Sequence, residues 1–225
     1  MKNFSFFLMA LCCSATSFGQ TQKPVYKPNA DIHFMPIALA FPDPSVRIGS
    51  ELMTGGRWSY GLSVGAGMKA FTFSRTPLSL FSSRSYRMME IRPEVKFYWL
   101  KRETLGWYLA AEGFVSSVNR QLGKDSYYLS DTTMVSFDGS HFSKKKMGLV
   151  WKIGVKFLVP EKLTIDMYTG LGLARTNVRY TKTENPTEDP YDPFFDPEDF
   201  YPGKKFTPVI SFGVKFGLLV WQKEE

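Results

Sequence analysis

The sequence predicts an all-β protein, an eight-stranded antiparallel transmembrane β-barrel with long extracellular loops. Three observations support this fold class: apolar residues alternate with small or charged ones, short connections alternate with long ones, and no run of about 18 apolar residues could form a membrane-spanning helix. The mean hydropathy of -0.18 is compatible with strands that are apolar on one face only. A length of 225 residues fits one domain.

Residues 1–19 are predicted to be a secretory signal peptide. A lysine precedes an apolar run over residues 4–13, and Ser17 and Gly19 supply the small residues before the cleavage that we expect after Gly19. The only two cysteines, Cys12 and Cys13, lie in this segment. A leucine precedes the first of them, where a lipoprotein signal has a small residue, which disfavours a lipid anchor. The mature chain then has no thiol for a disulfide, a metal site or a nucleophile.

The mature chain is predicted to begin with a polar periplasmic segment over residues 20–30, followed by the barrel over 31–221 and a periplasmic tail over 222–225. The strands are predicted from alternation and from the turn residues that bound them. They cover residues 31–41, 45–53, 57–73, 86–100, 106–119, 143–158, 163–181 and 206–221. The first is the least regular, because Pro36 interrupts it.

The two strands over 57–73 and 86–100 show the alternation clearly. Their apolar faces contain Trp58, Tyr60, Leu62, Val64, Ala66 and Met68, and Met89, Ile91, Pro93, Val95, Phe97 and Trp99. Their opposite faces contain Ser59, Gly61, Ser63, Gly65, Gly67 and Lys69, and Glu90, Arg92, Glu94, Lys96 and Tyr98. The pattern predicts an apolar face toward lipid and a polar face toward the lumen.

The strands over 143–158 and 163–181 repeat this pattern. Their apolar faces contain Met147, Leu149, Trp151, Ile153, Val155 and Phe157, and Leu163, Ile165, Met167, Leu171 and Leu173. A soluble lipocalin-like barrel, the main alternative fold, would need these apolar residues inside and would leave Arg92 and Lys96 without a place in its core.

The last strand contains a short motif, Ser211-x-Gly213-x-x-Phe216-x-Leu218. It resembles the C-terminal insertion signal of outer-membrane barrels, which is polar-x-Gly-x-x-aromatic-x-hydrophobic. It differs from the usual signal in that the chain continues past Phe216 to residue 225. The resemblance implies recognition by the barrel assembly machinery.

The connections fit both termini on the periplasmic side, because such barrels have short periplasmic turns and longer extracellular loops. The short links lie near residues 55–56, 101–105 and 159–162, and the long ones near 74–85, 120–142 and 182–205. The outer link at 42–44 is a brief exception. The residues Trp58, Trp99, Trp107 and Trp221 then lie near the periplasmic ends of strands, where an aromatic girdle belongs.

The lumen is predicted to contain charged residues of both signs. They are Arg47, Glu51, Lys69, Glu90, Arg92, Glu94, Lys96, Glu112, Lys152, Lys156, Asp166 and Lys215. An eight-stranded barrel is only wide enough for side chains to fill it, so we expect these charges to pair in a hydrogen-bonded plug. A narrow gated channel or a ligand cavity is the alternative.

Further basic residues lie near the predicted extracellular ends of strands. They are Arg75, Arg84, Arg87, Arg120, Lys144, Lys145, Arg175, Arg179, Lys204 and Lys205. They could bind lipopolysaccharide phosphates, which would account for much of the net charge of +7, or could be solvated loop residues. A barrel targeted outside the cytoplasm is not expected to bind nucleic acid.

The predicted outer loop over residues 184–202 alternates carboxylates with aromatic residues. The candidates for partner contact are Asp189, Tyr191, Asp192, Phe194, Phe195, Asp196 and Phe200. The aromatic residues could bind a protein and the carboxylates a calcium ion, but the loop lacks the spacing and the glycine of an EF-hand. A solvated loop is the third interpretation.

One pair of residues raises the possibility of an enzyme. The spacing of His141 and Ser143 resembles the His-x-Ser pair of outer-membrane lipid A deacylases, and both residues would face lipid. No carboxylate that could orient the imidazole follows over residues 150–158. His33 has no evident aspartate or serine partner in the sequence. We therefore predict no catalytic residues, no metal site and no cofactor.

From the signal peptide through eight Gly-rich alternating strands, the chain resembles the small outer-membrane barrels of the OmpA/OmpX shape. Its Ser-Phe-Gly-Gln cleavage region more narrowly resembles the PorT-type barrels of Bacteroidota. The resemblance implies a non-enzymatic outer-membrane barrel that serves as an accessory subunit of a secretion, assembly or transport complex. The alternatives are a lipid A-modifying enzyme and a narrow channel.

The closing seam of the predicted barrel contains two prolines. Pro36 and Pro208 each remove a backbone donor, from the first and the last strand respectively. We expect a weak seam, and hypothesise that a protein neighbour binds there.

Overall fold

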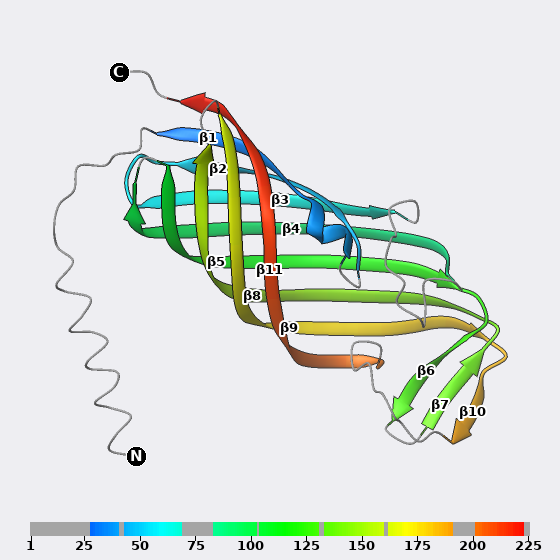
Figure 1. The fold of residues 1–225 in the computed structure, drawn as a ribbon. Coiled ribbons are helices and arrows are strands. Elements are labelled where there is room, and N and C mark those ends of the chain that lie inside the picture. The colour runs from blue at the N-terminus through cyan, green and yellow to red at the C-terminus, as the bar shows by residue number, and fades with distance from the viewer. Residues whose placement is uncertain are drawn as a thin grey trace, which may run out of the picture.

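The protein is an antiparallel barrel of eight strands in a computed structural model (Figure 1). The structure describes residues 28–40, 43–68, 83–102, 104–130, 133–159, 162–190 and 201–222. The barrel strands are β1 (Asn29–Met35), β2 (Val46–Met53), β3 (Trp58–Met68), β4 (Ser83–Lys101), β5 (Leu105–Leu122), β8 (Gly139–Val159), β9 (Leu163–Glu184) and β11 (Gly203–Gln222). They close in the order β1-β11-β9-β8-β5-β4-β3-β2. The prediction of an all-β, antiparallel, eight-stranded fold is confirmed at this level.

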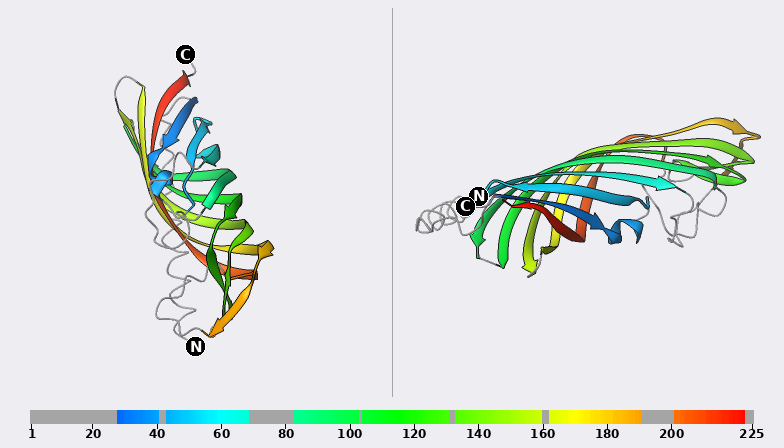
Figure 2. Two further views of the ribbon diagram at one scale, coloured as in Figure 1. Left: turned by 90° about the vertical axis from the view of Figure 1, so that its right-hand side faces the viewer. Right: turned by 90° about the horizontal axis from the view of Figure 1, so that it is seen from above.

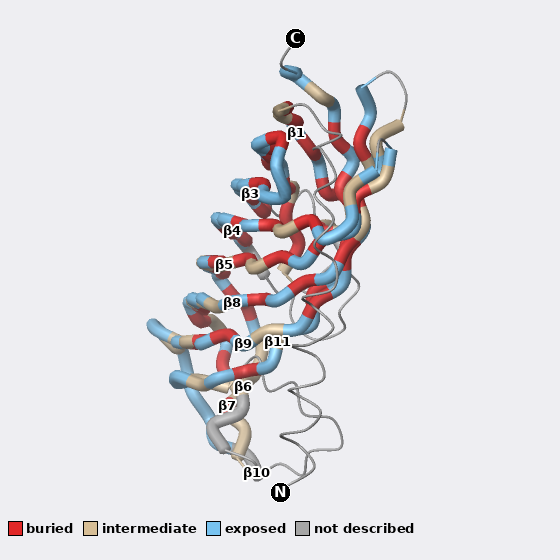
Figure 3. Tube along the Cα trace, turned by 90° about the vertical axis from the view of Figure 1, so that its left-hand side faces the viewer, coloured by how far each residue is buried: buried red, intermediate tan, exposed pale blue. Residues whose placement is uncertain are grey.

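Exposure alternates along every barrel strand, as the alternating colours of the tube show (Figure 3). The outward positions carry large apolar side chains, of which eight examples, one from each barrel strand, are given next. They are Phe34, Ile48, Leu62, Met89, Leu109, Trp151, Leu171 and Ile210. The inward positions are small, aromatic or charged and are mostly buried. The described residues contain no helix of the length and apolarity that a membrane crossing requires.

The first strand ends earlier than predicted. Residues 31–41 were expected to be one strand, but β1 stops at Met35 and the 3-10 helix η2 (Pro36–Ala40) follows. Proline has no backbone N–H for the sheet ladder and a fixed φ, so Pro36 favours this change. Met35 and Ala38 are buried against Tyr98, Tyr108 and Tyr168, so the segment lies inside the barrel.

The seam between the first and last strands is short. β1 pairs with β11 only from Phe34 opposite Phe216 to Asn29 opposite Gln222. Over residues 203–215, β11 pairs with β9 alone among the described strands, and Pro208 lies within this stretch.

The barrel wall is taller on one side. β1, β2 and β3 have 7, 8 and 11 residues, whereas β8 and β9 have 21 and 22, so the latter reach far past η2 (Figure 2). We call the end that holds Asn29 and Gln222 the terminal end, and the opposite one the far end. β2, β4 and β8 end at the terminal end, where β3, β5 and β9 begin a few residues later. The indoles of Trp99 and Trp107 stack there with centroids 6.4 Å apart.

A second sheet lies at the far end (Figure 1). Its strands are β6 (Asp125–Ser130), β7 (Thr133–Phe137) and β10 (Thr187–Pro190), in the order β10-β7-β6. The prediction of loops over 120–142 and 182–205 was therefore wrong in part. These strands are short, and tertiary contacts support them: the ring of Tyr127 stacks on Tyr180 of β9 with centroids 4.3 Å apart.

The interior has two kinds of packing. At the far end, Tyr86, Met88, Val118, Leu122, Phe137, Phe142 and Val178 form an apolar cluster. Toward the terminal end the interior is charged, and glycines make room for large side chains. A Cβ on Gly154 would lie 2.4 Å from the Tyr108 hydroxyl, so this close approach requires glycine.

Candidate functional site

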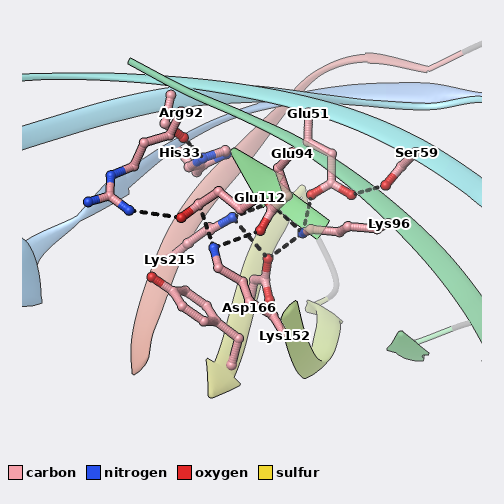
Figure 4. Close-up of polar contacts among 12 residues, drawn as sticks. His33, Glu51, Ser59, Arg92, Glu94, Lys96, Glu112, Lys152, Asp166 and Lys215 are labelled. Atoms are coloured by element: carbon pink, nitrogen blue, oxygen red, sulfur yellow. Dashed lines mark hydrogen bonds and ion pairs between the residues drawn. The ribbon is translucent and has the colours of Figure 1, made fainter. Parts of the chain in front are cut away.

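The candidate site is a network of buried charges in the lumen, which we call the lumen network (Figure 4). Its six basic members are Arg47, Arg92, Lys96, Lys152, Lys156 and Lys215, and its six acidic members are Asp31, Glu51, Glu90, Glu94, Glu112 and Asp166. Inward positions of seven strands supply them. The structure thus brings together eleven of the twelve residues predicted for the lumen. The twelfth, Lys69, lies outside the described residues.

The part of the network nearest the terminal end is built on Glu51 of β2. Its Oε2 accepts from the Nζ of Lys96 at 2.7 Å and of Lys156 at 3.0 Å. Lys96 also donates to Asp166 at 2.6 Å, and Lys156 also donates to Asp31. Each ammonium therefore bridges two carboxylates, which compensates for the loss of water around buried charges.

Glu94 of β4 connects the middle of the network. Its two oxygens accept from Lys152 at 2.9 Å and from Lys215 at 2.6 Å. Lys152 also donates to Glu112, which links β8 to β5.

Glu90 of β4 ends the network on the side of the far end. Its Oε1 accepts from the Nε of Arg47 at 2.8 Å and from the hydroxyl of Ser45 at 2.7 Å, and its Oε2 accepts from Arg92 at 2.7 Å. Arg92 then donates to Glu112 at 2.8 Å. Ion pairs therefore connect all twelve members of the lumen network without a break.

Neutral side chains complete the hydrogen bonding of the carboxylates. Ser59 and Tyr98 donate to Glu51 at 2.6 and 3.0 Å, and Tyr108 donates to Asp166. Sequence reasoning identified none of these three as partners, nor Asp31 as a member. Strand parity places all four on inward faces, and this signal could have found them.

His33 has partners that the sequence prediction missed. Its Nδ1 lies 3.1 Å from Oδ1 of Asp31, and its Nε2 lies 3.3 Å from the hydroxyl of Ser63 on β3. The expectation that His33 has no aspartate or serine partner was therefore wrong. The order Ser-His-Asp resembles that of a hydrolytic triad, but all three side chains are buried. A Cβ on the adjacent Gly49 would lie 2.3 Å from the serine hydroxyl, so a substrate has no room there.

A second ionic cluster lies on the far-end side of the lumen network. It consists of Asp43, Arg120 and Lys144, and we call it the Asp43 clamp. Asp43, between η2 and β2, accepts from Arg120 of β5 at 2.9 Å and from Lys144 of β8 at 2.5 Å. Both bases were predicted at the outer surface, but they are only 2% and 3% exposed. The surface prediction failed for two reasons. β5 continues past its predicted end at residue 119 and Arg120 faces inward, and Lys144, within the predicted strand over 143–158, occupies an inward position of β8.

The clamp changes the acidity of its carboxyl group. Burial by itself would raise the pKa of Asp43, but the charges of Lys144, Arg120 and Lys146 outweigh burial and hold the pKa below its ordinary value of 3.8.

The proposed lipid-modifying pair does not form a catalytic arrangement. His141 and Ser143 both occupy outward positions of β8, where His141 is exposed. Within the described residues, neither side chain hydrogen-bonds to the other or to a carboxylate. The described part of the chain also contains no group of three His, Cys, Asp or Glu side chains that could hold a metal ion.

The other candidates lie in β11 and near β10. Ser211 and Gly213 of the insertion motif are buried, whereas Phe216 and Leu218 are exposed. Asp189 belongs to β10. The remaining candidates for partner contact, Tyr191, Asp192, Phe194, Phe195, Asp196 and Phe200, lie outside the described residues, as do residues 1–19.

One family model matches the sequence, and it covers residues 7–192. Its description is "Protein of unknown function (DUF3575)". No curated protein and no solved structure matches the chain.

Replacing Lys152 by methionine is expected to lower the free energy of unfolding by roughly 3–5 kcal/mol, because Glu94 and Glu112 would lose a shared buried cation. Urea denaturation of the protein in detergent, followed by tryptophan fluorescence, measures this. Lys145→Met on an exposed position of the same strand is the control and should change stability by about 0.5 kcal/mol or less. Equal effects of the two replacements would contradict the network.

The clamp should contribute stability in a pH-dependent way. Because the folded-state pKa of Asp43 is depressed, its contribution is present above the unfolded-state pKa and is lost as pH falls through the folded-state pKa. Near neutral pH we expect Asp43→Asn to cost about 2 kcal/mol. The difference from the unaltered protein should shrink steadily in acid below about pH 4. Urea denaturation of both proteins over this range is the test, and a difference that is constant with pH would disprove the assignment.

Proposed function

The chain belongs to the DUF3575 family, and because the description of that family assigns no function, we propose from the geometry that the protein is a non-enzymatic integral outer-membrane β-barrel. It acts as an accessory subunit, with its far end outside the cell and its terminal end in the periplasm. The proposal includes cleavage of residues 1–19 and the kinship with PorT-type barrels of Bacteroidota.

The observation that carries this proposal is the reversed polarity of the barrel. Charges are buried in the lumen, while large apolar side chains such as Leu171 and Ile210 are 67% and 71% exposed on the outer face. Soluble proteins rarely expose a continuous apolar surface of this extent, whereas a lipid bilayer requires one. A soluble lipocalin-like barrel would have the opposite polarity.

Three features outside the belt of exposed apolar side chains on the outer face support the accessory role. The β10-β7-β6 sheet lies at the far end, where a surface partner would reach it. The stretch of β11 over 203–215 that lacks β1 as a neighbour offers a second contact, because backbone groups in a membrane need partners. Exposed bases such as Arg175 and Arg179 could bind lipopolysaccharide phosphates at this height.

The two alternative functions have less support. A channel would need a path through the lumen network, whose paired side chains occupy the lumen, and single-channel recording would detect one. An enzyme built on His141 and Ser143 would need a group to orient the imidazole, and an altered lipid A profile in His141→Ala cells would reveal it.

Replacing Leu171 by arginine should separate a membrane barrel from a soluble one. In a bilayer, an arginine near the middle of the belt costs about 2–4 kcal/mol, whereas on a water-exposed surface it costs almost nothing. Folding into phosphatidylcholine vesicles, measured by urea titration, gives this cost. Thr181→Arg lies on the same face of β9 nearer the far end and is the control, with little expected effect. If Leu171→Arg folds as well as the control, the membrane assignment is wrong.

The accessory role predicts a stoichiometric companion. Protein extracted from native membranes in mild detergent should bring that companion with it, identified by mass spectrometry. Pro36 lies in η2 and not at the seam, so the seam is tested at Pro208, which is exposed on the stretch of β11 that β1 does not cover. Replacing Pro208 and Phe194–Phe195 should weaken the complex if the seam and the outer loop form the contacts. Recovery of the barrel with lipopolysaccharide alone would refute the accessory role.

A further inference from the structure

A cavity of about 180 Å³ lies between the lumen network and the Asp43 clamp. Polar side chains from five strands and from the segment before β2 line it: Asp43, Arg47, Arg92, Ser116, Lys146 and Ser211. On the β11 side it borders the stretch that lacks β1 as a neighbour. Because water in the liquid occupies roughly 30 Å³ per molecule, the volume fits a few waters or one small ion.

The charges that line the cavity are unbalanced. Three cations, Arg47, Arg92 and Lys146, face one carboxylate, that of Asp43. Asp43 is already bound to Arg120 and Lys144. The carboxylates that neutralise the two arginines belong to the lumen network and do not line the cavity.

Two of the cations have donors to spare. Arg92 uses its Nε and Nη1 for Glu90 and Glu112, and its Nη2 has no hydrogen-bond partner among the described residues. Its guanidinium also lies 4.8 Å from the ring centroid of Phe114, which holds it in place. Lys146 is half-buried on the inward face of β8 and makes no ion pair within 4 Å with any described carboxylate.

Lys146 therefore differs from every lysine of the lumen network. Each of those contacts at least one carboxylate, as a buried ammonium requires. An anion in the cavity would serve Lys146 and the free Nη2 of Arg92 together. The hydroxyl groups of Ser116 and Ser211 could supply further hydrogen bonds.

We propose that this cavity binds one small oxyanion of the size of inorganic phosphate, held by Lys146 and Arg92. Tetrahedral oxyanions accept several charge-assisted hydrogen bonds at once, and planar guanidinium groups bind them well. The site is independent of the partner and of membrane insertion, so it can be tested in detergent whether or not the proposed function holds.

Isothermal titration calorimetry with inorganic phosphate on the detergent-purified full chain is the test. We expect saturable binding with one site per chain. Lys146→Ala should weaken the affinity roughly tenfold or more, because one charge-assisted hydrogen bond is lost. Lys145→Ala removes the same charge from the neighbouring, outward position and should leave the affinity within about twofold. Lys146→Gln, which keeps most of the side chain but replaces the ammonium by a neutral amide, should also weaken the affinity.

Three outcomes would overturn the proposal. They are the absence of saturable phosphate binding, an equal loss of affinity in the Lys145 and Lys146 variants, and binding only of phosphatidic acid in mixed micelles. The last outcome would assign the phosphate to a lipid headgroup outside the wall rather than to a free anion in the lumen. Unchanged circular dichroism of each variant verifies that the fold is intact.

Discussion

The structure depends on pairing of charge inside the barrel. Taking an ammonium or a carboxylate out of water costs several kcal/mol, and only opposite charges with good hydrogen bonds offset that cost. Lys96 meets this condition with Glu51 and Asp166, and Glu94 meets it with Lys152 and Lys215. Because the partners come from different strands, the same contacts that neutralise the charges also connect opposite walls of the barrel.

The outer face follows from the inner one. In a strand, successive side chains point to opposite faces, so a lumen of charged and small residues leaves the apolar residues outside. On β3, the inward residues Ser59 and Ser63 are small and leave space in the lumen for the longer side chains of the neighbouring strands β2 and β4. A barrel of this polarity is stable in lipid, and that is why the membrane proposal rests on polarity rather than on any single residue.

The interior near the far end is packed with apolar and aromatic side chains instead of ion pairs. There an aromatic cluster around Phe142 and Tyr180 replaces the ion pairs, and the small second sheet packs on it. The Asp43 clamp lies between these two parts of the interior, since Arg120 contacts the ring of Phe142 in the apolar cluster and the cavity next to Asp43 is lined by Arg47 and Arg92 of the lumen network. The cavity is a consequence of that boundary, since neither the network nor the cluster fills the space between them.

The sequence by itself determined the fold class and the facing of most strand residues, because alternation with a period of two is a local property of the chain. All eight barrel strands and eleven of the twelve described lumen charges could be predicted in this way. Only the tertiary structure decided the partners: Lys96 and Asp166 are 70 residues apart, and strand register and barrel closure bring them together. Contacts with distant segments also decided three features that the sequence did not predict. These are the partners of His33, the inward position of Arg120, and the short strands β6, β7 and β10.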